Sequence, residues 1–508
     1  MSRKSNDRLP GDLKSRLGLV AGIGAAFVIM LLDLDPASPV VTRTAAVAVL
    51  MAIWWITEAI PIPATALLPV ALFPLLGVMS GKDVAATYFN NVIFLFVGGF
   101  IVALAMERWN LHRRIALRII MLIGASPRRI LLGFMIATAF LSMWISNTAT
   151  TMMMVPIALA VIFKLRESQP GAAVNRLAVG LLIGIAYAAS IGGIATLIGT
   201  PPNLAFNKIF HTTFPGAPEI TFADWFVFGL PVSLVLLAAA WSLLTLMFSP
   251  RRGELSPDLA LFRDERAKLG RMSFEEKLVL VHFVVLAFLW LFRSAIQIGS
   301  LTIPGWSQLF GSPSYIDDGT VAIFVALLLF IMPARSRRGE RLMDWRTAVK
   351  LNWGIVILFG GGFALAAGFK ESGLSAWLAQ QLTGLAGVPQ VGMVASVSTL
   401  LTFLTELTSN TATTQIVLPL LASLAKAIRI NPLLLMVPAT LSASCAFMLP
   451  VATPPNAIIF GTGEIKMSDL MRVGIILNLV GVLLITALVY LIGLAAFGID
   501  PGQFPAWA

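Results

Sequence analysis

The sequence is poor in the residues that most enzymes and metal sites depend on. Among 508 residues there is one cysteine, Cys445, and the three histidines lie far apart. A single cysteine excludes internal disulfides and cysteine-based metal or cluster sites, and the histidines lack ligand spacing. A membrane enzyme would need histidine, cysteine or paired carboxylates at its polar cluster, and none occurs there. We therefore expect a protein that is not an enzyme and has no organic cofactor.

Charge is also scarce. Charged residues make up 12% of the chain, hydrophobic residues 58%, and the mean hydropathy is +0.88. Soluble domains carry about 25% charged residues, so lipid is the expected solvent. Apolar runs that approach the roughly 20 residues of a membrane-spanning helix recur along the chain. We expect an integral, multi-pass protein of the cell (inner) membrane, and we attribute the net charge of +11 to cytoplasmic loops rather than to nucleic-acid binding.

The distribution of arginine and lysine predicts the topology. The segments 106–129, 249–277 and 333–350 are rich in basic residues and are predicted to be cytoplasmic, as is the N-terminus. The connections that are poor in basic residues are predicted to be external. These constraints predict eleven spans and an external C-terminus. The predicted spans are 17–33, 42–59, 62–79, 91–106, 177–206, 225–248, 278–296, 319–333, 353–370, 432–460 and 470–497.

Two halves of the chain are related. The string Ser146-Asn147-Thr148-Ala149-Thr150-Thr151 recurs unchanged from Ser409 to Thr414, an offset of 409 − 146 = 263. A Gly-Gly-Phe sequence ends at Phe100 and again at Phe363, which gives the same offset. The predicted topology gives the halves opposite orientations, and such an inverted repeat is typical of secondary transporters with a site near the midplane.

Each half carries a predicted re-entrant hairpin and a predicted broken span. The stretch 130–165 has basic residues at both ends, so it enters and leaves on one side, and 390–426 is its counterpart. Thr-Pro-Pro-Asn occurs at 200–203 and 453–456, and its prolines predict interruptions near 199–203 and 452–456. A break exposes carbonyl groups for a cation and a helix N-terminus for an anion.

The duplicated polar residues suit an anion and a cation together. Hydroxyl groups donate and accept, and an asparagine can face a carboxylate with its nitrogen and a cation with its oxygen. No basic residue lies at either hairpin tip or break, so bound cations would have to neutralise a dianion. Polar contacts that only hold helices together are the alternative, which two identical copies disfavour. Glu406 replaces the first-half residue Met143, and its role stays open.

The motifs resemble those of the divalent-anion:sodium symporter family, which includes di- and tricarboxylate and sulfate transporters. The resemblance rests on the paired motifs and on Trp54-Trp55-Ile56-Thr57-Glu58-Ala59-Ile60-Pro61, and favours the sodium-coupled dicarboxylate branch. It implies a homodimer that works as an elevator, with a scaffold domain and a moving transport domain. The implied segments are the N-terminal 1–16, scaffold and linker 17–129 and 278–389, transport 130–248 and 390–497, the loop 249–277 and the tail 498–508.

The resemblance also implies individual site residues. Substrate contacts would come from both polar motifs and from both breaks: Ser146, Asn147, Thr148, Thr200, Ser409, Asn410, Thr411 and Thr453. One Na⁺ site would use Ser142, Ser146, Asn147 and Gly199. The second would use Thr405, Thr408, Asn410 and Ala452.

The sequence thus predicts an all-α transporter that imports C4 dicarboxylates such as succinate, malate and fumarate together with Na⁺. A dicarboxylate exchanger and a sulfate or tricarboxylate carrier remain open within the family. A passive anion channel is the alternative of a different class. It would need a continuous polar pore, whereas the polar residues cluster at two hairpins and two breaks.

Overall fold

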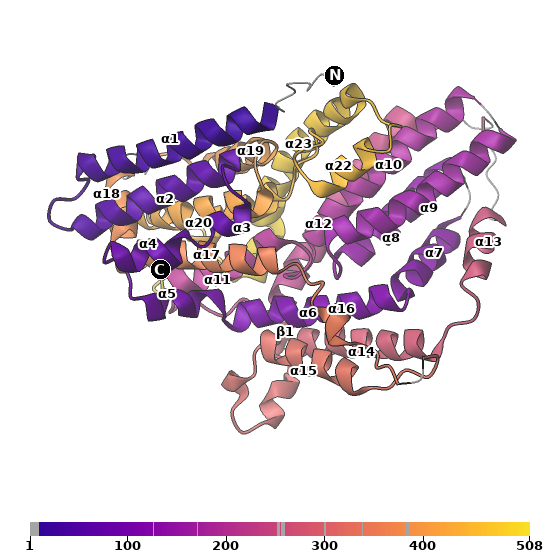
Figure 1. The fold of residues 1–508 in the computed structure, drawn as a ribbon, viewed down its shortest axis with the longest axis horizontal. Helices are drawn as coiled ribbons and strands as arrows, with labels where there is room; N and C mark the ends of the chain where they lie inside the picture. Colours follow the sequence, from indigo (N-terminus) through magenta and orange to yellow (C-terminus); the bar gives the residue numbers. More distant parts are fainter. Residues whose placement is uncertain are drawn as a thin grey trace, which may run out of the picture.

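The computed structural model describes residues 10–124, 126–169, 171–250, 254–255, 260–298, 301–337, 339–382, 384 and 387–508. The described chain is almost entirely helical, as predicted (Figure 1). The all-α prediction misses one small feature, an antiparallel pair of strands, β1 (Ile296–Ile298) and β2 (Leu301–Ile303). These strands lie in a connection that was predicted to be external, and their β-branched residues favour an extended backbone.

Eight helices in the described ranges are long and apolar enough to cross a membrane, by length and composition. This finding supports an integral membrane protein. The predicted span 62–79 is wrong as a single helix, because it forms the short helices α3 (Ile62–Thr65) and α4 (Leu68–Leu75). Pro69 lacks an amide donor, so a helix that continued from α3 would lose a backbone hydrogen bond at the start of α4, whereas Pro74 is accommodated within α4.

Most of the longer helices coincide with predicted spans but have shifted ends, whereas the short helices α5 (Gly81–Tyr88), α13 (Ala260–Lys268) and α16 (Trp345–Ala348) lie in predicted connections. Along the sequence, the helices before and after the first repeat's hairpin are α1 (Pro10–Leu32), α2 (Pro39–Thr57), α5, α6 (Asn91–Arg108), α14 (Phe274–Leu291), α15 (Asp318–Ile331), α16 and α17 (Trp353–Glu371). Between and after them lie α12 (Phe222–Phe248), α13 (Ala260–Lys268), α23 (Met467–Leu488), a π-helical turn (Val489–Gly493), α24 (Leu494–Ala496) and two 3₁₀ turns (Trp306–Leu309, Pro313–Tyr315).

The predicted loop 106–129 contains an unpredicted helix, α7 (Leu111–Ile123). Its apolar side is buried through Leu111, Ala116, Leu117 and Ile120 and packs on the first hairpin. Arg118 is exposed and Arg113 and Arg114 are partly exposed, so the segment is an amphipathic helix rather than an irregular connection. Counting basic residues located this segment but could not show its periodicity.

The duplication is visible in the helix boundaries. Helix boundaries of the first half recur 263 residues later. For example, α6, which contains the first Gly-Gly-Phe sequence, ends at Arg108, and α17, which contains the second, ends at Glu371. The first hairpin is α8 (Pro127–Ser142) and α9 (Asn147–Ser168), and the second is α19 (Gln390–Thr405) and α20 (Asn410–Ala427). Likewise α7 starts at residue 111 and α18 (Leu374–Gln381) at residue 374. The predicted repeat therefore extends to the secondary structure.

The two halves are intertwined. Each predicted broken span is a pair of helices, α10 (Ala172–Gly193) with α11 (Pro201–Thr213), and α21 (Leu433–Ala443) with α22 (Pro454–Phe460). Helix α11 packs on α20 of the second hairpin, and α22 packs on α9 of the first. Each half-helix thus lies against the hairpin of the other repeat, which brings the two duplicated motifs into one structural unit.

Candidate functional site

Four helices begin at the four duplicated motifs. Ser146 and Ser409 are the N-cap residues of α9 and α20, and Thr200 and Thr453 are the N-cap residues of α11 and α22. A helix N-terminus carries free amide donors and a partial positive charge, which favour an anion. The N-termini at the breaks were predicted, whereas those at the Ser-Asn-Thr motifs were not. They supply positive potential where the sequence has no basic side chain.

The positions of the breaks correct the prediction. The non-helical segments are 194–200 and 444–453, and both helices restart at the first proline of Thr-Pro-Pro-Asn. The prolines therefore begin a helix instead of interrupting one, because a first-turn residue needs no amide partner and the fixed φ of proline suits that position. The irregular backbone lies just before each motif.

Asparagines at the ends of the motifs hold both breaks in shape. The Asn203 amide nitrogen donates to the carbonyl groups of Gly193, Ile194 and Thr196 at 2.8–3.3 Å. The equivalent nitrogen of Asn456, 253 residues later, donates to Ala446 and Leu449. Both side chains are completely buried. The duplicated Thr-Pro-Pro-Asn motif marks these asparagines in the sequence. It does not show that their side chains donate hydrogen bonds to the backbone of the breaks.

The first hairpin and first break place several oxygen atoms close together. Ser142 Oγ lies 2.7 Å from both Asn147 Oδ1 and the Ala189 carbonyl oxygen. A hydroxyl has one proton, so it can donate to only one of these two acceptors. Rotating the Asn147 amide by half a turn brings its nitrogen within 3.3 Å of Ser142 Oγ, Ala189 O and Gly199 O. The amide is therefore surrounded by oxygen ligands of the kind that hard cations prefer.

The second hairpin repeats this arrangement. Thr405 Oγ1 lies 2.6 Å from Asn410 Oδ1 and 2.9 Å from the Ala443 carbonyl oxygen. The hydroxyl of Thr408, another residue of the implied second Na⁺ site, contacts Leu404 O and Thr413 Oγ1. The carbonyl groups of Ala189 and Ala443 were not predicted, because no sequence pattern marks a backbone oxygen.

Two glycines at the first break allow a close approach of backbone atoms, and the second break has alanines at the corresponding positions. A Cβ at Gly199 would lie 2.5 Å from the Gly193 carbonyl oxygen, and a Cβ at Gly193 would lie 2.8 Å from Asn147 Oδ1. Only glycine allows this close approach of backbone to the cation-binding candidates. Alanines stand at the corresponding second-repeat positions, Ala446 and Ala452.

Several candidate side chains keep free hydrogen-bonding capacity. Ser146 Oγ accepts the Ala149 amide, and Thr453 Oγ1 accepts the Asn456 amide. Within the described part of the chain, other hydroxyl groups of the candidate set make no hydrogen bond to protein: Thr148, Thr200, Ser409 and Thr411. Thr200 is only 2% exposed. A hydroxyl that makes no hydrogen bond to protein can still donate to or accept from a ligand or water.

Glu406 has a defined structural role. Its Oε1 accepts the amides of Phe447 and Met448 and the side-chain nitrogen of Asn478, and its Oε2 accepts the amide of Leu449. The four distances are 2.7–3.0 Å, and the residue is 3% exposed. The carboxylate thus fixes the second break from the hairpin tip. In the first repeat the Met143 carbonyl oxygen accepts Thr196 Oγ1 instead.

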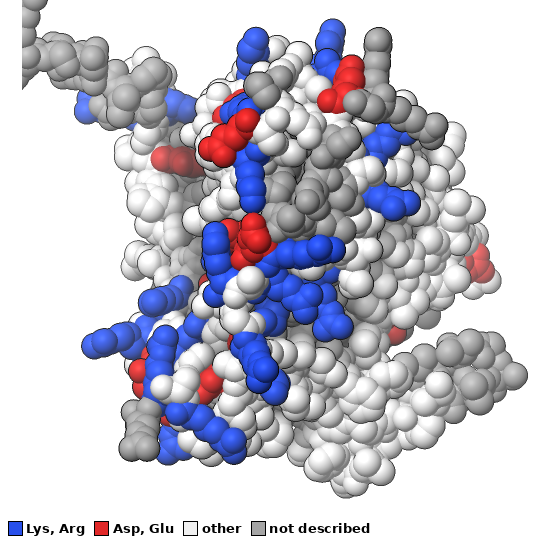
Figure 2. Space-filling view, turned by 90° about the vertical axis from the view of Figure 1, so that its right-hand side faces the viewer, with Lys and Arg blue, Asp and Glu red and all other residues white. Residues whose placement is uncertain are grey.

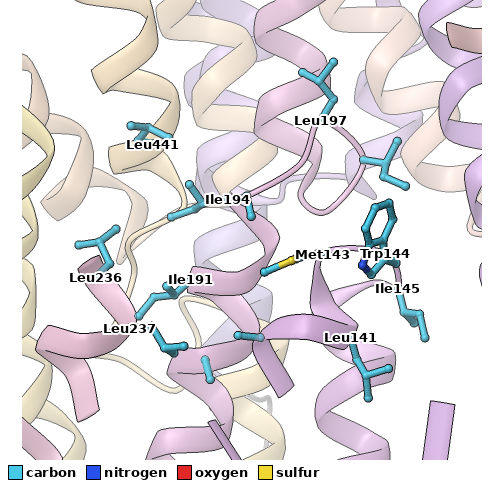
Figure 3. Packing of buried hydrophobic residues seen from close by; sticks show 14 of the residues in the cluster. Leu141, Met143, Trp144, Ile145, Ile191, Ile194, Leu197, Leu236, Leu237 and Leu441 are labelled. Atoms are coloured by element: carbon cyan, nitrogen blue, oxygen red, sulfur yellow. The ribbon is translucent and has the colours of Figure 1, made fainter. Parts of the chain in front are cut away.

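Buried apolar residues lie in the first hairpin turn and belong to the hydrophobic core. Met143, Trp144 and Ile145 of the hairpin turn belong to the same buried hydrophobic cluster as Ile194 and Leu197 of the break, and Figure 3 labels all five. This packing fixes the turn that presents Ser146, because buried side chains are close-packed and resist displacement. A separate cavity of about 320 Å³ near the C-terminal tail is lined by Glu219, Asp224 and Asp500 but by no basic residue, so it does not suit a dianion.

These features define a polytopic helical membrane protein in which each repeat carries a cluster of polar side chains and backbone oxygens. A family model for the sodium:sulfate symporter transmembrane region matches residues 14–496. The chain belongs to this family. It is 44% identical to the sodium-dependent dicarboxylate transporter SdcS of Staphylococcus saprophyticus, over 90% of this chain and 87% of that protein. It is also 44% identical to SdcS of Staphylococcus aureus strain MRSA252, over 98% and 95% of the two chains.

Solved structures share the fold at low identity. The Alcanivorax borkumensis YdaH transporter matches with a TM-score of 0.58 at 14% identity, over 95% of this chain and 99% of that chain. Neisseria gonorrhoeae MtrF, of a class of antimetabolite efflux pumps, matches with a TM-score of 0.54 at 14% identity, over 82% and 83%. Both neighbours are transport proteins, and at this identity the likeness concerns the fold alone.

Proposed function

We propose that the protein is a secondary transporter that imports C4 dicarboxylates, such as succinate, malate and fumarate, together with Na⁺. The observation that carries this proposal is the pairing, in each repeat, of an oxygen cluster around an asparagine with two helix N-termini. The oxygen cluster suits Na⁺, and the N-termini suit a carboxylate. Relatives named as sodium-dependent dicarboxylate transporters support this choice over sulfate.

The proposed roles follow the two chemistries. Substrate would be held by Ser146, Asn147, Thr148, Thr200, Ser409, Asn410, Thr411 and Thr453. One Na⁺ would bind at Ser142, Ser146, Asn147 and Gly199, and the other at Thr405, Thr408, Asn410 and Ala452. The free hydroxyls and the crowded oxygens support these assignments. Asn147 and Asn410 belong to both sets, so anion and cation would stabilise each other.

We also propose an elevator arrangement with eleven spans. The segments 130–248 and 390–497 would form the transport domain, and 17–129 and 278–389 would form the scaffold and linkers of a homodimer. The N-terminal segment would be cytoplasmic and the tail 498–508 external. The intertwined packing of α11 with α20 and of α22 with α9 supports a single moving unit.

Uptake of labelled succinate into proteoliposomes tests the function. We expect uptake to require an inward Na⁺ gradient and to proceed without internal substrate, because the site offers no fixed positive charge and needs Na⁺ as counter-charge. An equal choline gradient is the control. Uptake that ignores Na⁺ and requires internal succinate would instead establish an exchanger, and competition by sulfate but not by malate would reject the dicarboxylate assignment.

Removal of single hydroxyls should separate the two ligands. We expect Ser142→Ala and Thr405→Ala to raise the Na⁺ concentration for half-saturation, and Thr200→Ala and Thr453→Ala to weaken succinate binding at saturating Na⁺. A hydrogen bond to a charged group contributes about 1.5–3 kcal/mol, or roughly tenfold to over a hundredfold in affinity. Calorimetric titration across a Na⁺ series measures both constants. The assignment is wrong if both pairs of variants affect the two ligands equally.

A further inference from the structure

Basic side chains gather at one end of the molecule. Figure 2 views the end of the structure where α7, α13 and the neighbouring ends of α9 and α10 lie in Figure 1, and blue side chains are spread across that face. Several basic side chains in this part of the structure have acidic partners. Arg113 pairs with Glu265, and Arg114 with Glu276, at 2.8 and 2.9 Å. Paired charges of this kind hold neighbouring segments together and leave little positive charge for a ligand.

Three arginines lie near the corner where α7 ends and α8 begins. Arg118, Arg128 and Arg129 are exposed, and their guanidinium groups make no hydrogen bond or ion pair within the described ranges. The end of α7 and the start of α8 are packed closely, since a Cβ at Gly133 would lie 3.2 Å from the Ile120 Cα. Three positive charges without a protein partner in the described ranges are therefore carried by two closely packed helices, and their mutual repulsion favours an anionic partner.

The apolar surroundings indicate which partner this is. Leu122 follows Arg118 by one helical turn, so it lies on the same side of α7, and it is 77% exposed. Trp241 of α12 donates its indole N–H to the Arg128 carbonyl oxygen at 3.2 Å. Tryptophan is enriched at the level of lipid headgroups in membrane proteins. The corner thus combines phosphate-binding groups with an apolar side chain beside an interfacial tryptophan.

We propose that the α7–α8 corner binds the phosphate headgroup of an anionic phospholipid through Arg118, Arg128 and Arg129, with Leu122 against the acyl chains. Arginine binds phosphate in a bidentate manner, and basic residues beside a bilayer attract anionic lipid. This proposal goes beyond the transport function and requires only that the chain spans a membrane.

The second repeat shows that this feature is not a consequence of the duplication. The positions 263 residues after the three arginines are Gln381, Val391 and Gly392, none of which is charged. The corner therefore serves one end of the molecule only. Since α7 joins α6 to the first hairpin, the bound lipid would hold this connection at the membrane surface.

Titration of the detergent-solubilised protein with POPG tests the proposal, with the melting temperature followed by tryptophan fluorescence. We expect POPG to raise the melting temperature of the wild type, and POPC to leave it unchanged. Each arginine near an anionic lipid surface contributes about fivefold in affinity, so the triple variant R118Q/R128Q/R129Q should need roughly a hundredfold more POPG. Its melting temperature without lipid should equal that of the wild type, because the three side chains have no protein partner.

A matched variant controls for net charge. R263Q/R266Q/R271Q removes the same three charges from exposed positions in and after α13, and we expect its POPG titration to match that of the wild type. Equal losses in both variants would show a diffuse charge effect and overturn the proposal. It would also be overturned if inorganic phosphate stabilises the wild type as well as POPG does, or if polyglutamate does so, which would indicate an acidic protein partner. Because no step measures transport, failure of the proposed function would leave these outcomes unchanged.

Discussion

Replacing Asn147 or Asn410 by alanine is expected to weaken the binding of both Na⁺ and succinate. Each amide oxygen lies within 2.7 Å of a hydroxyl that also contacts a backbone carbonyl, and each asparagine is the first residue of a helix. In the proposed site the amide oxygen faces the cation and the amide nitrogen faces the carboxylate. Losing contacts to two charged ligands should cost about 1.5–3 kcal/mol for each, or roughly tenfold to over a hundredfold in each affinity.

Linkage provides a second, quantitative check. If the two ligands meet at one asparagine, Na⁺ must raise succinate affinity and succinate must raise Na⁺ affinity by the same factor. Calorimetry in detergent across a Na⁺ series measures both factors, and each alanine variant should reduce them together. Asn352→Ala, at an exposed helix cap on α17, is the matched control and should bind as the wild type does. Variants at 147 and 410 that stay folded and bind both ligands within about twofold of wild type would refute the shared site.

Identity between distant segments predicted much of this architecture. One offset of 263 residues, found from two short strings, also relates the helix ends at Arg108 and Glu371 and both hairpins. A duplicated sequence folds in a duplicated way because the same local propensities and buried faces recur. The candidate side chains were found in this way as well, since polar residues in a lipid-facing sequence are conspicuous.

The features that sequence patterns missed depend on backbone geometry or on tertiary contacts. The carbonyl groups of Ala189 and Ala443 belong to residues without polar side chains, so nothing in the sequence marks them. The breaks lie before the prolines because proline is tolerated in the first turn of a helix. The presence of a proline in the sequence does not show whether it begins a helix or interrupts one. Helix α7 was missed because counting charges ignores the 3.6-residue period.

Glu406 illustrates a side chain whose role depends on contacts between segments distant in sequence. Glu406 lies at the turn between the two helices of the second hairpin. Its four hydrogen-bond donors belong to residues further along the chain: Phe447, Met448, Leu449 and Asn478. The offset showed only that Glu406 breaks the symmetry with Met143. A buried carboxylate without a basic partner is stabilised when several N–H groups donate to it, so the second break and this charge depend on each other.

We therefore expect Glu406→Ala to be among the most damaging single substitutions in the chain. It leaves two buried and two partly buried donors without their acceptor, at about 1–3 kcal/mol for each buried unsatisfied group, against a typical total stability of about 5–15 kcal/mol. Melting temperature in detergent should fall steeply, and any folded fraction should have lost Na⁺-dependent succinate binding because the segment before Thr453 is no longer held.

Glu406→Gln separates geometry from charge. Its amide oxygen can replace Oε1 and keep three of the four hydrogen bonds, but its nitrogen faces the Leu449 amide donor. We expect this variant to fold, with a melting temperature between those of the wild type and the alanine variant, and to need about tenfold more Na⁺ for half-saturation. Glu371→Ala, at an exposed position at the end of α17, is the control and should change stability by less than about 0.5 kcal/mol. If Glu406→Ala has the same melting temperature as the Glu371→Ala control and binds Na⁺ as the wild type does, the carboxylate does not hold the break. The geometry of residues 444–453 must then be maintained by the hydrogen bonds of the Asn456 side chain alone.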